Sequence, residues 1–135
     1  MNAIATTAQP APFLQPLCLR THRLTNALIL LVIPVQFYAA GFGIFRAGSM
    51  VPHALIGYFL VLVALVSLIS AAIARRSLPD LGRAFGVLVL IIMQPLLIHV
   101  PRYTLPELSA LHPVNGLAIG VLAFVIHQRL RTAPR

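Results

Sequence analysis

The sequence has few charged residues, and almost all of them carry the same sign. Its 135 residues include ten Lys or Arg against two Asp or Glu, which gives a net charge of +8, and all ten cations are arginines. Charged residues make up 9% of the chain, whereas soluble domains carry about 25%. With 59% hydrophobic residues and a mean hydropathy of +0.94, the composition excludes an ordinary soluble enzyme and favours a membrane protein.

Several motifs are also missing. The single cysteine, Cys18, excludes an internal disulfide. The arginines form neither a basic run nor a surface interleaved with aromatics, so nucleic acid is not an expected partner. There is no Gly-x-Ser-x-Gly motif, phosphate-binding loop or Cys/His metal cluster, which excludes the common hydrolase classes. Residues 1–19 lack a basic residue ahead of a short apolar stretch and are interpreted as a flexible or interfacial N-terminus, not a secretory signal.

Four apolar stretches are long enough to cross a bilayer. A hydrocarbon core of about 30 Å requires about 20 residues per helix. Helices are expected because backbone groups in lipid must form their hydrogen bonds within the protein. The predicted spans cover residues 24–45, 53–74, 84–100 and 108–127. Together they form a single domain over residues 20–130, followed by a cytoplasmic tail at 131–135.

The arginines are unevenly distributed between the two ends of these spans. Eight lie at the end shared by the termini and the loop at 75–83, and two, Arg46 and Arg102, lie at the opposite end. Membrane proteins carry an excess of basic residues on the cytoplasmic side. We therefore expect a multi-pass protein of the bacterial inner membrane, with both termini in the cytoplasm and its arginines beside anionic lipid of the bilayer.

The two halves of the chain repeat a short pattern. Gln36 is followed seventeen residues later by His53, and Gln94 is followed eighteen residues later by His112. Each histidine has a glycine four residues further on, and each half has one arginine in its outer loop. The sequence predicts an all-α bundle of four transmembrane helices. Its two tandem hairpins would be related by a pseudo-twofold axis along the membrane normal, as in transporters with parallel repeats.

Two histidines at equivalent positions of such a repeat are suited to hold one haem iron from both faces. Glycines one and two helical turns beyond the ligands would leave room for the porphyrin, since positions i and i+4 share a helix face. Arginines of the outer loops would pair with the haem propionates. The predicted iron ligands are His53 and His112, and the other predicted cofactor-binding residues are Gly57, Gly116, Gly120, Arg46, Arg102, Gln36, Gln94 and His99.

Other roles remain open for several of these residues. The second-half glycines also form a small-xxx-small motif, which lets two helices approach closely. Gln36 and Gln94 either form hydrogen bonds between helices or line the inner edge of a cofactor pocket. His99 is a partner of the site, a proton relay or a substrate-side group. His22 and His127 are expected to be solvated among arginines, with a second haem between them as the alternative.

Three blocks of the sequence resemble a family of small, four-helix bacterial membrane proteins of unassigned function. The blocks are Val35–Gly43, His53–Tyr58 and Ala110–Gly116, and the Leu-His-Pro-Val-Asn-Gly motif in the last of them is the most specific. The resemblance covers residues 24–129, nearly the whole chain apart from its ends. It implies a four-helix membrane protein and leaves the activity undefined.

More distantly, each half resembles the helix pairs of haem A synthase and of four-helix b-type cytochromes, in which histidines borne on helices bind haem. This resemblance implies His53 and His112 as axial ligands of haem b. The only acidic residues are Asp80 and Glu107, and neither lies in a motif of those proteins. The resemblance therefore does not extend to the carboxylate associated with haem hydroxylation.

The predicted function is electron transfer by a bis-histidine cytochrome near the outer face, with a quinone or a redox protein as partner. Two strong axial ligands leave the iron no open position, which favours electron exchange over oxygen binding. One alternative is a small transporter or channel, although the span centres hold no Asp, Glu, Lys or Arg to exchange protons. The other is a structural subunit of a homo-oligomer or a larger membrane complex.

Overall fold

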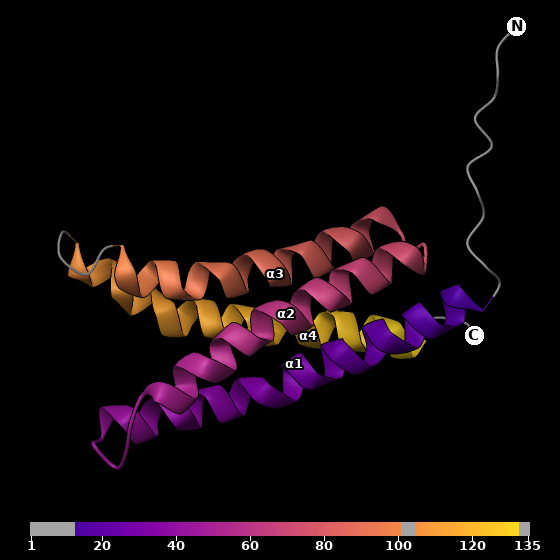
Figure 1. Cartoon of the computed structure of the whole chain (residues 1–135). Helices are drawn as coiled ribbons and strands as arrows, with labels where there is room; N and C mark the ends of the chain where they lie inside the picture. The colour runs from indigo at the N-terminus through magenta and orange to yellow at the C-terminus, as the bar shows by residue number, and fades with distance from the viewer. Residues whose placement is uncertain (1–12, 101–104, 133–135) are drawn as a thin grey trace, which may run out of the picture.

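The computed structural model describes residues 13–100 and 105–132, which form four long helices and one short 3₁₀ helix (Figure 1). The elements are α1 (Leu14–Ile44), α2 (Val51–Ile73), α3 (Leu78–His99), η2 (Pro106–Ala110) and α4 (Leu111–Thr132). No strand occurs within these two described ranges. Each long helix is long and apolar enough to cross a membrane. The expected all-α, multi-pass membrane class is therefore confirmed.

The helices extend beyond the predicted spans where the sequence becomes polar. Helix α1 begins at Leu14, so residues 14–19, expected to belong to a flexible or interfacial N-terminus, form its first turns. Pro16 is tolerated there because the amide groups of a first turn have no partner within the helix. The hydroxyls of Thr21 and Thr25 donate to backbone carbonyls one turn earlier, at 3.1 and 2.9 Å. A span identified only from apolar composition does not include these polar first turns of the helix.

Helices α1 and α2 end in the same way, with an arginine in the left-handed conformation. Arg46 has φ 59° and Arg75 has φ 53°. The following amides, of Ala47 and Arg76, donate to carbonyls five residues back, at 3.0 and 3.1 Å. This is the Schellman arrangement, in which glycine usually occupies the left-handed position. Both helices therefore end sharply and turn the chain back into the bundle.

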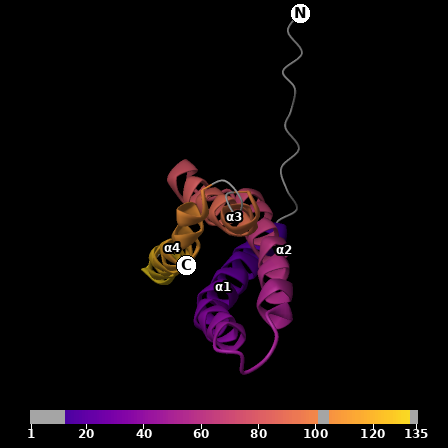
Figure 2. The ribbon, with the colours of Figure 1, turned by 90° about the vertical axis from the view of Figure 1, so that its left-hand side faces the viewer.

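The four long helices form a bundle in chain order. Each contacts the helices before and after it in sequence, and α1 closes the bundle against α4, so α2 and α4 lie diagonally opposite each other. We call the end with Leu14, Thr132 and the α2–α3 connection the terminal end, and the end with the α1–α2 loop and η2 the hairpin end. The α1–α2 pair and the α3–α4 pair move apart toward the hairpin end (Figures 1 and 2).

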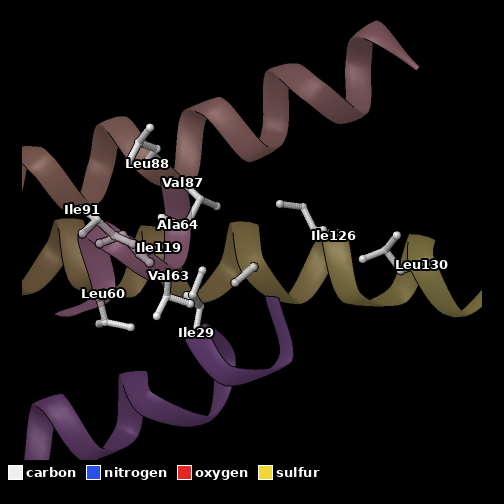
Figure 3. Packing of buried hydrophobic residues seen from close by; sticks show 11 residues of the cluster. Ile29, Leu60, Val63, Ala64, Val87, Leu88, Ile91, Ile119, Ile126 and Leu130 are labelled. Atoms are coloured by element: carbon white, nitrogen blue, oxygen red, sulfur yellow. The ribbon is translucent and has the colours of Figure 1, made fainter. Parts of the chain in front are cut away.

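The buried core extends from the middle of the bundle to the terminal end. Figure 3 shows side chains of all four helices meeting there, and the cluster comprises Ile29, Leu60, Val63, Ala64, Val87, Leu88, Ile91, Ile119, Ala123, Ile126 and Leu130. Small residues are common at these contacts, and Ala64, Ala71 and Ala123 are at most 1% exposed. Helices in membranes associate largely through such close packing, because lipid tails are as apolar as leucine. The large apolar side chains on the outside face the bilayer.

Candidate functional site

The structure brings the two predicted iron ligands together. His53 lies in the first turn of α2 and His112 in the first turn of α4, and their ring centroids are 5.8 Å apart. The ring planes are inclined by 62°, so the rings are not stacked. Because α2 and α4 are diagonal in the bundle, the pair bridges the two hairpins. Metal and cofactor sites of helix bundles are commonly built from side chains of facing helices in this way.

Each histidine is held by a hydrogen bond to the other helix of its own hairpin. Nδ1 of His53 lies 3.1 Å from the backbone oxygen of Gln36, and Nδ1 of His112 lies 3.1 Å from that of Gln94. A carbonyl oxygen only accepts, so both Nδ1 atoms carry the hydrogen and donate it. Each Nε2 then keeps its lone pair. Metal-binding histidines typically show this arrangement, because the bond at the first nitrogen fixes the tautomer and the ring orientation.

The separation of the rings suits a metal ion between them. Two metal–nitrogen bonds of about 2 Å, together with the distance from each nitrogen to its ring centre, require centroids on the order of 6 Å apart. The observed 5.8 Å is close to this requirement. The same separation, with the 62° inclination, also matches a direct edge-to-face contact of two rings, for which centroids lie about 4.5–7 Å apart. The distance between the rings therefore agrees with both arrangements, and axial ligation of an iron by this pair stays a prediction.

The number of ligands narrows the choice of metal centre. Within residues 13–100 and 105–132, no three or more His, Cys, Asp or Glu side chains gather to hold a metal ion. Structural and catalytic zinc sites use three or four protein ligands. A haem iron needs only one or two, since the porphyrin supplies the other four. The donor set of two imidazoles therefore fits haem better than a bare ion.

The glycines beside the histidines accommodate the two glutamines. A Cβ atom at Gly57 would lie 3.3 Å from Nε2 of Gln36, and one at Gly116 would lie 3.2 Å from Nε2 of Gln94. Both distances are tighter than ordinary carbon contacts, and hydrogen bonding favours the orientation of Gln94 in which its amide oxygen faces Gly116 and accepts from the backbone amide, at 3.2 Å. The bare backbone therefore makes room for an amide of the same hairpin, and Oε1 of Gln36 is buried without a hydrogen-bond partner. A role of these glycines in clearing space for a porphyrin remains a prediction that requires the amides to move.

The glycine motif of α4 also faces α1. A Cβ atom at Gly116 would lie 3.3 Å from Cζ of Phe37, and one at Gly120 would lie 3.5 Å from Cγ2 of Ile33. The two helices thus approach closely along this line, as the small-xxx-small motif predicts. Helix packing is the role that the contacts of Gly120 support.

The remaining predicted site residues lie further from the pair. Arg46 is exposed in the α1–α2 loop, and His99 is exposed as the last residue of α3. Within the described parts of the chain, neither forms a hydrogen bond with His53 or His112. Arg102 lies outside the described residues. The pairing of arginines with haem propionates therefore stays a prediction.

His22 lies in a different environment from the one expected. It is 1% exposed, and its Nδ1 lies 2.8 Å from the hydroxyl of Ser67 on α2. The expectation that it is solvated among arginines is wrong, because α1 starts two turns before it and carries it into the bundle. One turn further on, the amide of Asn26 donates to the backbone oxygen of Ala123, at 3.0 Å. Sequence reasoning did not find these polar contacts, although polar residues at i and i+4 in an apolar helix are a usable signal.

Asn115 is a further residue that the sequence did not assign. Its amide donates to the backbone oxygen of Leu90, at 2.7 Å, and so joins α4 to α3 three residues after His112. This bond fixes the start of α4 against its hairpin partner. It thereby adds to the support of the histidine that α4 carries.

Comparison with known families shows one similarity. Residues 36–100, a little under half of the chain, match a family of unknown function (DUF6220). The segment contains Gln36, His53 and Gln94 and ends before His112. This match agrees with the expected resemblance to a family of unassigned function. No curated protein and no solved structure matches the chain, so the likeness to haem A synthase and b-type cytochromes stays a prediction.

Proposed function

We propose that the chain is a membrane cytochrome in which His53 and His112 are the axial ligands of one haem b. The observation that carries the proposal is the histidine pair: two imidazoles from different hairpins, 5.8 Å apart, each with Nδ1 bonded to a backbone oxygen. Bound haem would supply a centre that gains and loses one electron. With both axial positions filled by protein, electron transfer is the function that this arrangement favours.

The two hairpins make equivalent contributions to the proposed site. Each provides one histidine, one backbone oxygen that orients it and one glutamine amide packed on a glycine. This correspondence supports a pseudo-twofold relation between the hairpins, with the ligand pair on its axis. The imbalance of arginines supports cytoplasmic termini in the bacterial inner membrane, which places the histidines near the outer face.

The electron partner in this proposal is a quinone or a redox protein at the outer face. A groove of about 340 Å³ lies on the hairpin end of α1, lined by Tyr38, Gly41, Phe42, Phe45 and Ala47. The groove is open, and its exposed aromatic side chains give an apolar surface that suits contact with a lipid-soluble carrier. The protein's own part is to hold the two histidines and present this surface.

Absorption spectra test the proposal. Protein expressed with a haem precursor and purified in detergent should show a Soret band, and reduction with dithionite should sharpen a band in the visible region. His53→Ala and His112→Ala should each lower the haem content at least tenfold. Leu55→Ala is the matched control, because Leu55 lies on the exposed surface of α2, two residues from His53, and is 62% exposed. A colourless wild-type preparation, or unchanged haem content in the double variant, would rule out the proposal.

Labelling of introduced cysteines tests the proposed orientation. In a Cys18→Ser background, Ser49→Cys in the α1–α2 loop should react with a membrane-impermeant maleimide in intact cells. Leu78→Cys, at the other end of the bundle and 83% exposed, should react only after the cells are permeabilised. The reverse pattern would place the histidine pair on the cytoplasmic side.

A further inference from the structure

A cluster of arginines surrounds the single carboxylate at the terminal end. Nη2 of Arg76 lies 2.8 Å from Oδ2 of Asp80, Nη1 of Arg83 lies 2.9 Å from Oδ1, and Nε of Arg129 lies 3.0 Å from Oδ1. We call Arg76, Arg83 and Arg129 the arginine cluster. It joins the α2–α3 connection and α3 to the last turns of α4. Arg83 follows Asp80 by three residues on α3, a spacing at which charged side chains meet on a helix.

The charges of this cluster do not balance. Three guanidinium groups surround one carboxylate, so the cluster keeps an excess of two positive charges. The hydroxyl of Ser77 also donates to Oδ2 of Asp80, at 2.9 Å, so both carboxylate oxygens already accept two bonds. A guanidinium has five N–H donors. Most donors of the cluster therefore remain for another acceptor, and Nε of Arg76 is buried without a hydrogen-bond partner.

The position of the cluster limits what this acceptor is. The side chain of Arg129 is 50% exposed and that of Arg83 is 29% exposed, whereas Asp80 is only 11% exposed. The cavity beneath, lined in part by His22 and Arg76, measures about 10 Å³ and holds about one water. An anion must therefore bind on the outer side. Because the cluster sits where the helices leave the apolar core, this side is at the depth of the lipid headgroups.

We propose that the arginine cluster binds the phosphate of an anionic lipid headgroup. Arginine pairs with phosphate through two parallel hydrogen bonds. Basic pockets between transmembrane helices on the cytoplasmic side are suited to anionic headgroups. Asp80 orients the three guanidinium groups, and the lipid phosphate supplies the missing negative charge. The site is remote from His53 and His112, so it holds independently of the haem proposal.

Binding of short-chain lipids to the detergent-purified protein tests this assignment. Dihexanoyl phosphatidylglycerol should bind more tightly than dihexanoyl phosphatidylcholine, which has no net charge. The double variant Arg76→Gln/Arg129→Gln should weaken phosphatidylglycerol binding about 100-fold, since each substitution removes a hydrogen bond between charged groups that contributes about tenfold. The matched control is Arg20→Gln/Arg131→Gln, which removes the same charge from exposed positions at the same end. The control should lose fivefold or less, and equal losses in the two variants would overturn the proposal.

A second variant separates lipid binding from a purely structural ion-pair network. Asp80→Asn keeps one acceptor oxygen to orient the guanidinium groups and raises the excess charge of the cluster, so phosphatidylglycerol should bind about fivefold more tightly. If the arginines serve only to hold Asp80, the same variant should bind the lipid more weakly or equally, which contradicts the proposal. Inorganic phosphate at the same concentration should not displace the lipid. Displacement would assign the cluster to free phosphate and overturn the lipid assignment.

Discussion

The two halves of the bundle differ in how deeply their polar side chains are buried and in how these side chains are hydrogen-bonded. In the terminal half, His22 and Asn26 are each 1% exposed and bonded to a neighbouring helix, within a continuous core. In the hairpin half, only Ala39 and Gly116 are buried among residues 31–59, 92–100 and 105–118. The two histidines there keep their Nε2 lone pairs. The terminal half therefore holds the bundle together. The hairpin half leaves Nε2 of His53 and of His112 without a hydrogen between two diverging hairpins.

The largest expected effect comes from enlarging a small residue in the packed half. Ala123 is 0% exposed, and Ala123→Leu should lower the free energy of unfolding by about 1–3 kcal/mol, because the added carbons have no space. Ala118→Leu, on the exposed surface of the same helix, should change it by less than about 0.5 kcal/mol. Thermal unfolding in detergent measures both. Equal effects would show that the core does not close around Ala123.

The second-largest loss of unfolding free energy is expected from removing hydrogen bonds between helices. Asn26→Leu removes a buried bond between α1 and α4 and should cost about 1 kcal/mol of unfolding free energy. Asn115→Leu removes a shorter but only half-buried bond in the hairpin half and should cost less. The same unfolding assay compares them. A larger loss for Asn115→Leu would mean that the hairpin half contributes more to stability than its burial indicates.

Replacing a glycine beside the histidines with alanine should change the free energy of unfolding by less than the substitutions above. Gly57→Ala should alter stability by less than about 0.5 kcal/mol, since the gain in helix propensity offsets one contact with the amide end of Gln36. Gly116→Ala should be less stable than Gly57→Ala, because its Cβ also meets the ring of Phe37. If the glycines clear space for a porphyrin, Gly57→Ala should lower haem content without lowering stability. Unchanged haem content would remove Gly57 from the proposed pocket.

The smallest effect is expected at the glutamines. The oxygen that holds His53 belongs to the backbone, so Gln36→Leu should retain haem binding within about twofold of the wild type. Gln94→Leu should bind less haem than Gln36→Leu, because the amide of Gln94 also lies 3.1 Å from Nδ1 of His112. Haem content per polypeptide measures both. Loss of haem in Gln36→Leu would show that the amide side chain, and not the backbone, supports His53.

The sequence predicts the spans and the histidine pair for different physical reasons. Long apolar runs identify membrane helices because lipid requires backbone groups to bond within the helix. The similar spacing from Gln36 to His53 and from Gln94 to His112 pairs the two histidines, whose ring centroids lie 5.8 Å apart in the structure. The start of α1 was missed because residues 14–23 are not apolar enough to count as a span. That omission also hid the burial of His22. The contact of Arg129 with Asp80 joins two helix ends and depends on packing that no local pattern records.

Each histidine is oriented by its own hairpin, yet the two rings meet only when the hairpins come together. Each hairpin can therefore orient its own histidine before the two hairpins pack against each other. A cofactor bound by both histidines would link the two hairpins in the half of the bundle that has the fewest buried residues. We expect haem binding and the approach of the two hairpins at the hairpin end to occur together. Two separately expressed hairpins should therefore associate more readily when haem is supplied.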